Sequence, residues 1–374
     1  MKKITAFLLV FSLLFFLPKK AMALEVSAKA AIVVNAATGK VIYSQNADKR
    51  LPMASTTKIM TALLLCEMAD LNDTVVTTKE MVTVEGSSMG LLEGDTVSFR
   101  GLLYGMMLPS GNDAATTTAI ALGGSLQEFA LLMNQKARQL SMDNTNFVTP
   151  SGLDADNHYS TAADMAKLAV YAMKNPLFRE AVATKSISVE YGNPPYLRRL
   201  SGHNKILSLY DGGIGIKTGY TSKSGRCLVS AANRNGVEVI AVTLGDSDIW
   251  NHHKKLLDLG FSNMNSVTFS APKTAKSLNA IGGEKSTVKL NCESFTVGLT
   301  PEEQERITYR ISLPEYLFAP LKSGETVGKI DYYLDNNILK SLNLTLEEDV
   351  QGLPSLKKDF LCDLLINLKT MLKL

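Results

Sequence analysis

The hydrophobic pattern over residues 24–262 switches between the strand period and the helix period. Short apolar runs predict strands at residues 31–34 and 41–43, with a Thr38-Gly39 turn between them. After Pro52, apolar residues recur every three or four positions, which predicts an amphipathic helix from about Ser55 to Ala69. Helical patterns continue within 98–180, and then come two strands and a last helix, at 227–232, 237–244 and 249–259. Strands at both ends with helices between them indicate one α/β domain over residues 24–262.

Beyond Gly260 the pattern changes to short β-prone segments separated by turns rich in Gly, Pro, Asn and Lys. These segments predict a small all-β domain over residues 263–352. The segments are 267–269, 286–290, 295–299, 307–311, 328–334 and 339–344.

Residues 353–374 return to the helical period. One stripe of this segment is apolar and consists of Phe360, Leu361, Leu364, Leu365, Leu368, Met371 and Leu372. The segment carries four lysines and two aspartates and its apolar runs are too interrupted to span a bilayer. It is predicted to be an amphipathic helix that lies on the outer face of the cytoplasmic membrane. The alternative is a helix that docks on its own protein.

The chain begins with the pattern of a secretory signal. Lys2 and Lys3 precede an almost wholly apolar run over residues 4–17, and Ala21-Met22-Ala23 supplies small residues at a cleavage site. An uncleaved anchor is the alternative, for which the run is short, since a spanning helix needs about 20 residues. Residues 1–23 are therefore predicted to be removed on export, and the mature chain to start at Leu24.

Composition excludes several classes of function. The chain has 374 residues, 45% of them hydrophobic, and a net charge of +3, without a basic cluster interleaved with aromatics, so no nucleic-acid binding is expected. The four cysteines show no CxxC spacing, and His252-His253 lacks a third ligand nearby, so no metal site is predicted. No cofactor is predicted either.

Candidate chemistry centres on Ser55-Thr56-Thr57-Lys58. Ser-x-x-Lys occurs four times in the chain, and Ser55 with Lys58 opens a long amphipathic helix of the α/β domain. Ser355 opens the terminal helix but has no partner motifs near it in sequence. A separation of three residues puts both side chains on one helix face. The partial positive charge at a helix N-terminus favours an alkoxide at Ser55 and disfavours a protonated Lys58. This spacing predicts a nucleophile and its base; a plain N-cap serine is the alternative.

Two further motifs follow in order. Ser110-Gly111-Asn112 lies in a loop before a predicted helix, and Lys217-Thr218-Gly219 precedes Tyr220 at the edge of a glycine-rich run. A strand at that edge would offer a lysine, a hydroxyl and a backbone N–H to a substrate carboxylate and carbonyl. Each motif alone is common, but the order Ser55, Ser110, Lys217 is difficult to reach by chance.

This set resembles the serine penicillin-binding proteins and β-lactamases. It is most similar to the low-molecular-mass D-alanyl-D-alanine carboxypeptidases, over nearly the whole mature chain. The stretches that carry the resemblance are 51–58, 108–114, 150–153, 158–162 and 215–221. The resemblance implies an α/β (α+β) penicillin-binding domain with an antiparallel sheet flanked by helices, then a small all-β domain and a terminal amphipathic helix. It also implies an enzyme that removes the terminal D-alanine from peptidoglycan stem peptides ending in D-Ala-D-Ala and is inhibited by β-lactams.

The resemblance further assigns roles to the motif residues. Ser55 would form the acyl-ester, Lys58 would accept its proton, and Ser110 would relay protons. The substrate-binding residues would be Asn112, Lys217, Thr218, Gly219 and Tyr220, with the backbone N–H groups of Ser55 and Tyr220 forming the oxyanion hole.

The sequence departs from the wider family at two points. Gly111 stands where other branches have an aspartate. The Glu-x-x-Leu-Asn setting of fast-deacylating lactamases is missing between Asn112 and Lys217, so a β-lactam is expected to act as inhibitor and not as substrate.

Two competing interpretations remain open from the sequence. Gly86-Ser87-Ser88-Met89-Gly90 fits the nucleophile elbow of α/β-hydrolase esterases. Its Ser88 would take an acid from Asp246 or Asp248 and a histidine from His252 or His253. The second interpretation is a non-catalytic wall-binding protein that β-lactams acylate. His158 and His203 are expected to be packed structural histidines.

Overall fold

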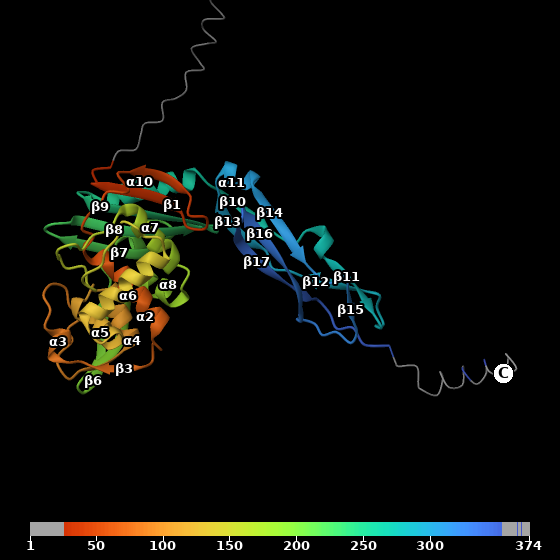
Figure 1. Ribbon diagram of the computed structural model, residues 1–374, viewed down its shortest axis with the longest axis horizontal. Helices are drawn as coiled ribbons and strands as arrows, with labels where there is room; N and C mark the ends of the chain where they lie inside the picture. Colours follow the sequence, from red (N-terminus) through yellow and green to blue (C-terminus); the bar gives the residue numbers. More distant parts are fainter. Residues whose placement is uncertain (1–25, 354–364, 366–367, 369–374) are drawn as a thin grey trace, which may run out of the picture.

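A computed structural model of the chain describes residues 26–353 together with Leu365 and Leu368. The predicted signal segment and all other residues of the predicted terminal helix from Pro354 onward lie outside the described residues. The described chain forms a compact α/β domain from which a β-rich domain extends to one side (Figure 1). Within residues 26–353, no helix is long and apolar enough to cross a bilayer.

The centre of the first domain is an antiparallel five-stranded sheet with the order β2-β1-β9-β8-β7. The strands are β1 (Ala30–Asn35), β2 (Val41–Gln45), β7 (Gly213–Thr221), β8 (Gly225–Arg234) and β9 (Val237–Asp246). All six residues of β1 are buried, and its residues from Ala30 to Val34 alternate between two hydrophobic clusters. Because neighbouring side chains of a strand point to opposite faces, both faces of this sheet must be covered by other elements.

Helices provide that cover, as predicted. Helix α10 (Ile249–Ser262) packs on one face against β1, β8 and β9. The other face meets α7 (Ala162–Ala172) and α8 (Pro176–Ala183). The remaining helical elements are η1 (Ala54–Thr57), α2 (Lys58–Met68), α3 (Lys79–Val82), α4 (Phe99–Met107), α5 (Asn112–Gly123), α6 (Leu126–Gln139) and α9 (Ile206–Leu209).

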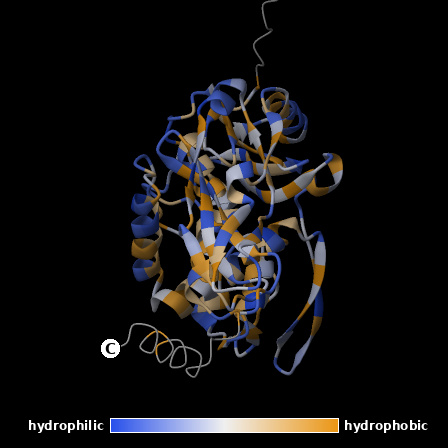
Figure 2. Ribbon diagram, turned by 90° about the vertical axis from the view of Figure 1, so that its right-hand side faces the viewer, coloured by the Kyte–Doolittle hydropathy of each residue, from blue (hydrophilic) through white to orange (hydrophobic). Residues whose placement is uncertain are grey.

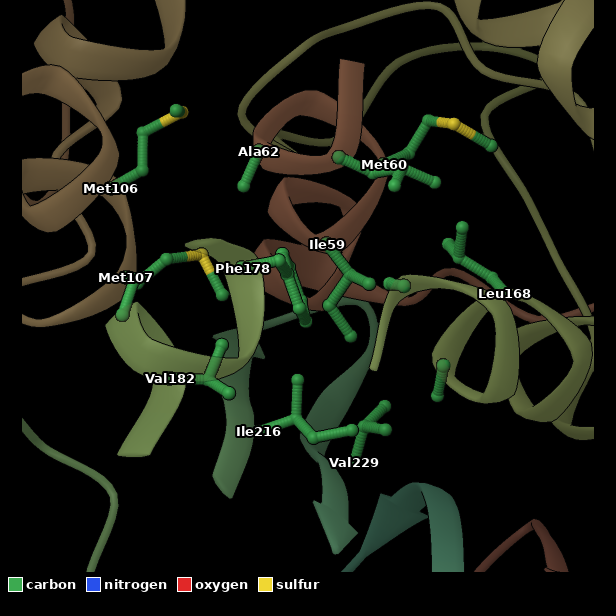
Figure 3. Close-up of a cluster of buried hydrophobic side chains, with 14 of the residues drawn as sticks. Ile59, Met60, Ala62, Met106, Met107, Leu168, Phe178, Val182, Ile216 and Val229 are labelled. Atoms are coloured by element: carbon green, nitrogen blue, oxygen red, sulfur yellow. The ribbon is translucent and has the colours of Figure 1, made fainter. Parts of the chain in front are cut away.

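Helix α2 differs from its prediction. It begins as a 3₁₀ turn at Ala54 and becomes α-helical at Lys58. Every residue from Lys58 to Leu65 is buried, so the amphipathic prediction was wrong. The reason is that α2 runs through the middle of the domain, where α4, α5, α7, α8 and β7 all pack against it. Figure 3 shows its Ile59 and Met60 among side chains of the surrounding helices and sheet.

The sequence pattern did not predict a small four-stranded sheet with the order β3-β4-β5-β6. Its strands are β3 (Thr74–Val76), β4 (Thr96–Ser98), β5 (Ser186–Gly192) and β6 (Pro195–Ser201). The first two have three residues each, too few to show a period. The last two form a hairpin with many exposed polar residues.

The β-rich domain contains the sheets β10-β13 and β14-β16-β17-β12-β11-β15. Its elements are β10 (Asn265–Phe269), η2 (Lys273–Ala275), β11 (Ser277–Ile281), β12 (Thr287–Asn291), β13 (Phe295–Leu299), α11 (Pro301–Glu305), β14 (Ile307–Ser312), β15 (Tyr316–Phe318), β16 (Thr326–Leu334) and β17 (Asn337–Leu346). The domain has a hydrophobic core of its own. Hydrophobic and hydrophilic residues alternate along individual elements (Figure 2), as expected for elements that bury one face.

Candidate active site

Ser55 and Lys58 lie one turn apart where η1 passes into α2. The Lys58 Nζ is 3.0 Å from Ser55 Oγ. Ser55 is partly exposed, whereas Lys58 is completely buried. A nucleophile that solvent can reach therefore contacts an amine that solvent cannot.

Two further oxygens surround the same amine. Lys58 Nζ is 2.6 Å from Asn112 Oδ1 and 2.8 Å from the backbone oxygen of Ser151. Both oxygens can only accept hydrogen bonds, and a neutral amine has two N–H groups and one lone pair. With both N–H groups donated to these oxygens, the lone pair is left for the Ser55 hydroxyl.

The electrostatic surroundings favour the neutral amine. Burial lowers the pKa of Lys58 well below its ordinary value, and the positive charge of Lys217 lowers it further. The carboxylate of Asp113 acts in the opposite direction. The sequence predicted that the helix N-terminus disfavours protonated Lys58, but the largest cause is desolvation, which requires knowing that α2 is buried.

Ser110 lies in the short loop between α4 and α5, and Asn112 is the first residue of α5. Ser110 is buried and has a φ of 64°, a conformation uncommon for a residue with a side chain. Asn112 donates from its side-chain amide to the backbone oxygen of Glu85 at 2.7 Å and from its backbone N–H to Ser87 at 2.7 Å. These bonds fix the amide so that its oxygen points to Lys58.

Sequence reasoning assigned no role to the loop around Ser151, whose backbone oxygen accepts from Lys58. Gly152 has a φ of +85°, and a Cβ there would lie 1.9 Å from the backbone oxygen of Ala54. The loop therefore approaches the nucleophile turn so closely that only glycine fits. Thr61 reinforces the contact by donating from its hydroxyl to the Pro150 oxygen at 2.6 Å.

His158 fixes the same loop to the nucleophile turn. Its Nδ1 accepts from the Val148 N–H at 2.9 Å, and its Nε2 lies 3.0 Å from Thr57 Oγ1. Burial lowers the pKa of His158 to about 4, so the ring is neutral at neutral pH. The prediction of a structural role is confirmed for His158, whereas His203 is exposed and was predicted wrongly.

The third motif lies on β7, the edge strand of the central sheet. Lys217 is buried and donates to the backbone oxygen of Thr218 at 2.9 Å. Burial lowers the pKa of Lys217 to about 7. A Cβ at Gly219 would lie 2.9 Å from the backbone nitrogen of Ser55, which places this strand directly against the nucleophile turn. Tyr220 is exposed.

The rival motif lacks the geometry of a hydrolase elbow. Ser88 lies in an irregular segment after α3, where the elbow needs a strand. Its hydroxyl donates to Asp113 at 2.5 Å. His252 bonds to Asp246, and His253 bonds to Ser230 and Thr243 within the packing of α10. The esterase interpretation is therefore wrong.

Comparisons with known proteins agree on one family. The family model for D-alanyl-D-alanine carboxypeptidases matches residues 18–248, and the model for the penicillin-binding protein 5 C-terminal domain matches residues 264–352. The chain is 30% identical to D-alanyl-D-alanine carboxypeptidase DacF of Bacillus subtilis, over 89% of this chain and 88% of the relative. It is 33% identical to DacC of Escherichia coli, over 93% and 90% respectively.

Solved structures give the same result. Penicillin-binding protein 5 from Haemophilus influenzae aligns with 88% of this chain and 99% of its own, at a TM-score of 0.63 and 28% identity. The Streptomyces K15 DD-transpeptidase aligns with 65% of this chain and 100% of its own, at a TM-score of 0.61 and 34% identity.

Proposed function

Because the chain belongs to the D-alanyl-D-alanine carboxypeptidase family of penicillin-binding proteins, we propose that Ser55 is its nucleophile and Lys58 its general base. The chain is a serine-type carboxypeptidase that acts on D-Ala-D-Ala peptidoglycan peptides and binds β-lactams. What the proposal adds is the role of each residue. Its main support is the buried Lys58 amine, 3.0 Å from Ser55 Oγ and held by two carbonyl oxygens.

Acylation begins at the Ser55 hydroxyl. Lys58 takes its proton while Oγ attacks the carbonyl carbon of the D-Ala-D-Ala peptide bond. The negative oxygen that forms accepts from the backbone N–H groups of Ser55 and Tyr220. The C–N bond then breaks, and the departing D-alanine nitrogen takes a proton that originates from Lys58 and passes through Ser110. Water later attacks the ester and releases the shortened peptide.

Substrate binding falls to β7 and Asn112. Lys217 and Thr218 bind the terminal carboxylate of the peptide, while Asn112 contacts the substrate backbone. Burial lowers the pKa of Lys217 to about 7, and a substrate carboxylate beside it raises this pKa again. Substrate binding therefore favours protonated Lys217, and protonation of Lys217 favours substrate binding. As an edge strand, β7 also offers backbone groups with which an extended peptide can pair.

Water, and not an amine, is the proposed acceptor of the acyl group. No additional domain for a donor or glycan strand accompanies the two domains described over residues 26–353. The Streptomyces K15 relative is named both a carboxypeptidase and a DD-transpeptidase, so the acceptor needs its own measurement. Without the deacylating glutamate of lactamases, the β-lactam ester persists.

We also propose the division into residues 24–262, 263–352 and 353–374, after a signal peptide over 1–23. Leu365 and Leu368 are helical and are 58% and 46% exposed, and a separation of three residues puts both on one helix face. Their exposure supports a surface helix that holds the enzyme on the outer face of the cytoplasmic membrane. Truncation before Ser355 should release active enzyme from liposomes; equal partitioning of both forms would refute the anchor.

Turnover of a D-Ala-D-Ala peptide tests the assigned roles. We expect Ser55→Ala to abolish both D-alanine release and β-lactam acylation. Ser88→Ala is the comparison variant, since Ser88 is the nucleophile of the rejected esterase interpretation. It loses one hydrogen bond to Asp113, so turnover should slow by several-fold at most and should not be abolished. Acylation without turnover by the wild-type protein would instead support a non-catalytic binding protein.

A further inference from the structure

A buried carboxylate next to the active site has no role in the mechanism above. Asp113 follows Asn112 and is 1% exposed. It accepts hydrogen bonds from the backbone N–H groups of Met89 at 2.9 Å, Gly90 at 3.0 Å and Leu91 at 3.0 Å, and from the Ser88 hydroxyl at 2.5 Å. One side chain thereby binds four successive residues of the loop over residues 85–91, which we call the 85–91 loop.

The same loop holds Asn112 in return. Glu85 accepts from the Asn112 side-chain amide and Ser87 from its backbone N–H, both at 2.7 Å. With one N–H of its NH₂ group donated to Glu85, the Asn112 amide presents its oxygen to Lys58 at 2.6 Å. Hydrogen bonds therefore link Asp113 to the 85–91 loop, the loop to Asn112, and Asn112 to the proposed base Lys58.

Two glycines leave the space that these hydrogen bonds need. A Cβ at Gly111 would lie 2.6 Å from Asp113 Oδ1 and 3.0 Å from the Met89 nitrogen. A Cβ at Gly86 would lie 2.8 Å from Asn112 Nδ2. The glycine in the second motif, where other branches have aspartate, thus leaves room in this chain for the Asp113 carboxylate.

The hairpin of β5 and β6 holds the loop from its other side. Tyr191 donates from its hydroxyl to the Met89 oxygen at 2.5 Å, and Arg198 donates to the Gly90 oxygen at 2.7 Å. Asp113 therefore satisfies the N–H groups of these peptides while the hairpin satisfies their carbonyl groups. Hydrogen bonds to both the N–H and the carbonyl groups fix a loop that has no regular secondary structure.

We propose that Asp113 is a positioning residue for acylation: its carboxylate holds the 85–91 loop so that Glu85 and Ser87 orient the Asn112 amide toward Lys58. The inference rests on the proposed roles of Ser55 and Lys58. Asp113 touches neither Ser55 nor the substrate and acts through Asn112.

The charge of Asp113 supplies a readout that a merely structural role would not move. The charged groups that act on Lys58 are Lys217 from β7 and Asp113 from α5, while the nearby His158 is neutral. Because Asp113 raises the pKa of Lys58, removing its charge lowers that pKa. Neutral Lys58 then persists to lower pH, so the acid limb of the acylation profile moves to lower pH.

The test measures acylation by a chromogenic cephalosporin against pH for the mature enzyme and Asp113→Asn. We expect the rate constant to fall about 10²-fold, as for a misplacement of about 1 Å at a reacting centre, with the acid limb shifted to lower pH. Asp331→Asn is the matched control, because Asp331 is a buried carboxylate of the β-rich domain, bonded to Ser341. It should acylate at the wild-type rate.

The proposal is overturned if the acylation rate constant of Asp113→Asn lies within threefold of the wild-type value. It is also overturned if acylation is slower but the acid limb of its pH profile does not move. If Asp113→Asn does not fold, Tyr191→Phe decides, since it removes one loop contact and keeps the charge. If Tyr191→Phe acylates several-fold more slowly while its melting temperature stays that of the wild type, the proposal is supported. Acylation of this variant at the wild-type rate overturns the proposal. Ser55→Ala separates the two levels, because acylation that survives in this variant refutes the proposed function itself.

Discussion

Replacing Gly219 by alanine should disable the proposed oxyanion hole while leaving the protein folded. The new Cβ would lie 2.9 Å from the Ser55 nitrogen, 3.1 Å from the Ala54 Cβ and 3.1 Å from the Met53 oxygen. Two of these atoms belong to the backbone of the nucleophile turn, which cannot rotate away as the end of a side chain can. The turn and β7 must therefore separate by several tenths of an ångström.

That separation sets the expected magnitude. Loss of one oxyanion donor costs about 10²–10³ in kcat, or about 2.7–4 kcal/mol of transition-state stabilisation. Overpacking costs about 1–3 kcal/mol of folding stability, which a folded domain of this size tolerates. Since the oxyanion exists only in the transition state, kcat should fall much more than KM rises.

The assay compares release of D-alanine from a D-Ala-D-Ala peptide by wild type, Gly219→Ala and Gly202→Ala. Gly202 is the control because its nearest neighbour would lie 3.4 Å from an added Cβ, an ordinary contact. Melting temperatures confirm that each variant is folded. Wild-type kcat in folded Gly219→Ala would refute the assignment of the Ser55 N–H to the oxyanion hole.

Three other predictions follow from the site. Lys58→Arg keeps a positive charge but cannot act as a base, so acylation should fall about 10²–10⁴-fold, and wild-type acylation would exclude Lys58 as the base. Burial lowers the pKa of Lys217 from 10.5 to about 7, so between pH 7 and pH 10.5 Lys217 is protonated in the unfolded chain and neutral in the folded one. The folded wild-type enzyme therefore gains stability as pH rises through that range. Lys217→Met should therefore raise the melting temperature more at pH 6 than at pH 9 while lowering kcat/KM, and an equal change at both pH values would contradict the buried-charge argument. With a pentapeptide donor and an amine acceptor, mass analysis should find mainly the tetrapeptide acid, and a dominant cross-linked product would refute water as the acceptor.

The sequence predicted those parts of the site that are written in contiguous residues. Ser55 with Lys58, Ser110 with Asn112, and Lys217 with Thr218 each form a short motif, because local spacing already places their side chains together. The structure brings Lys58 and Asn112 within hydrogen-bonding distance, and it places the β7 backbone at Gly219 against Ser55.

Contacts made by backbone groups were beyond the sequence. The Ser151 carbonyl that holds Lys58 carries no side-chain signature, since every residue has such an oxygen. Asp113 resembled an ordinary acidic residue in the first turn of a helix, because its partners lie more than twenty residues earlier. The burial of α2 was missed for a related reason: Lys58 and the threonines near it gave a polar face that tertiary contacts cover.

The most direct test of the account is the site of β-lactam acylation. After labelling and tryptic digestion, Ser55 falls in the peptide of residues 51–58, and Ser88 falls in the peptide of residues 80–100. Mass spectrometry should find the stoichiometric adduct on Ser55 in the first peptide, and Ser55→Ala should abolish it. An adduct on Ser88, or on any residue other than Ser55, would contradict the central claim.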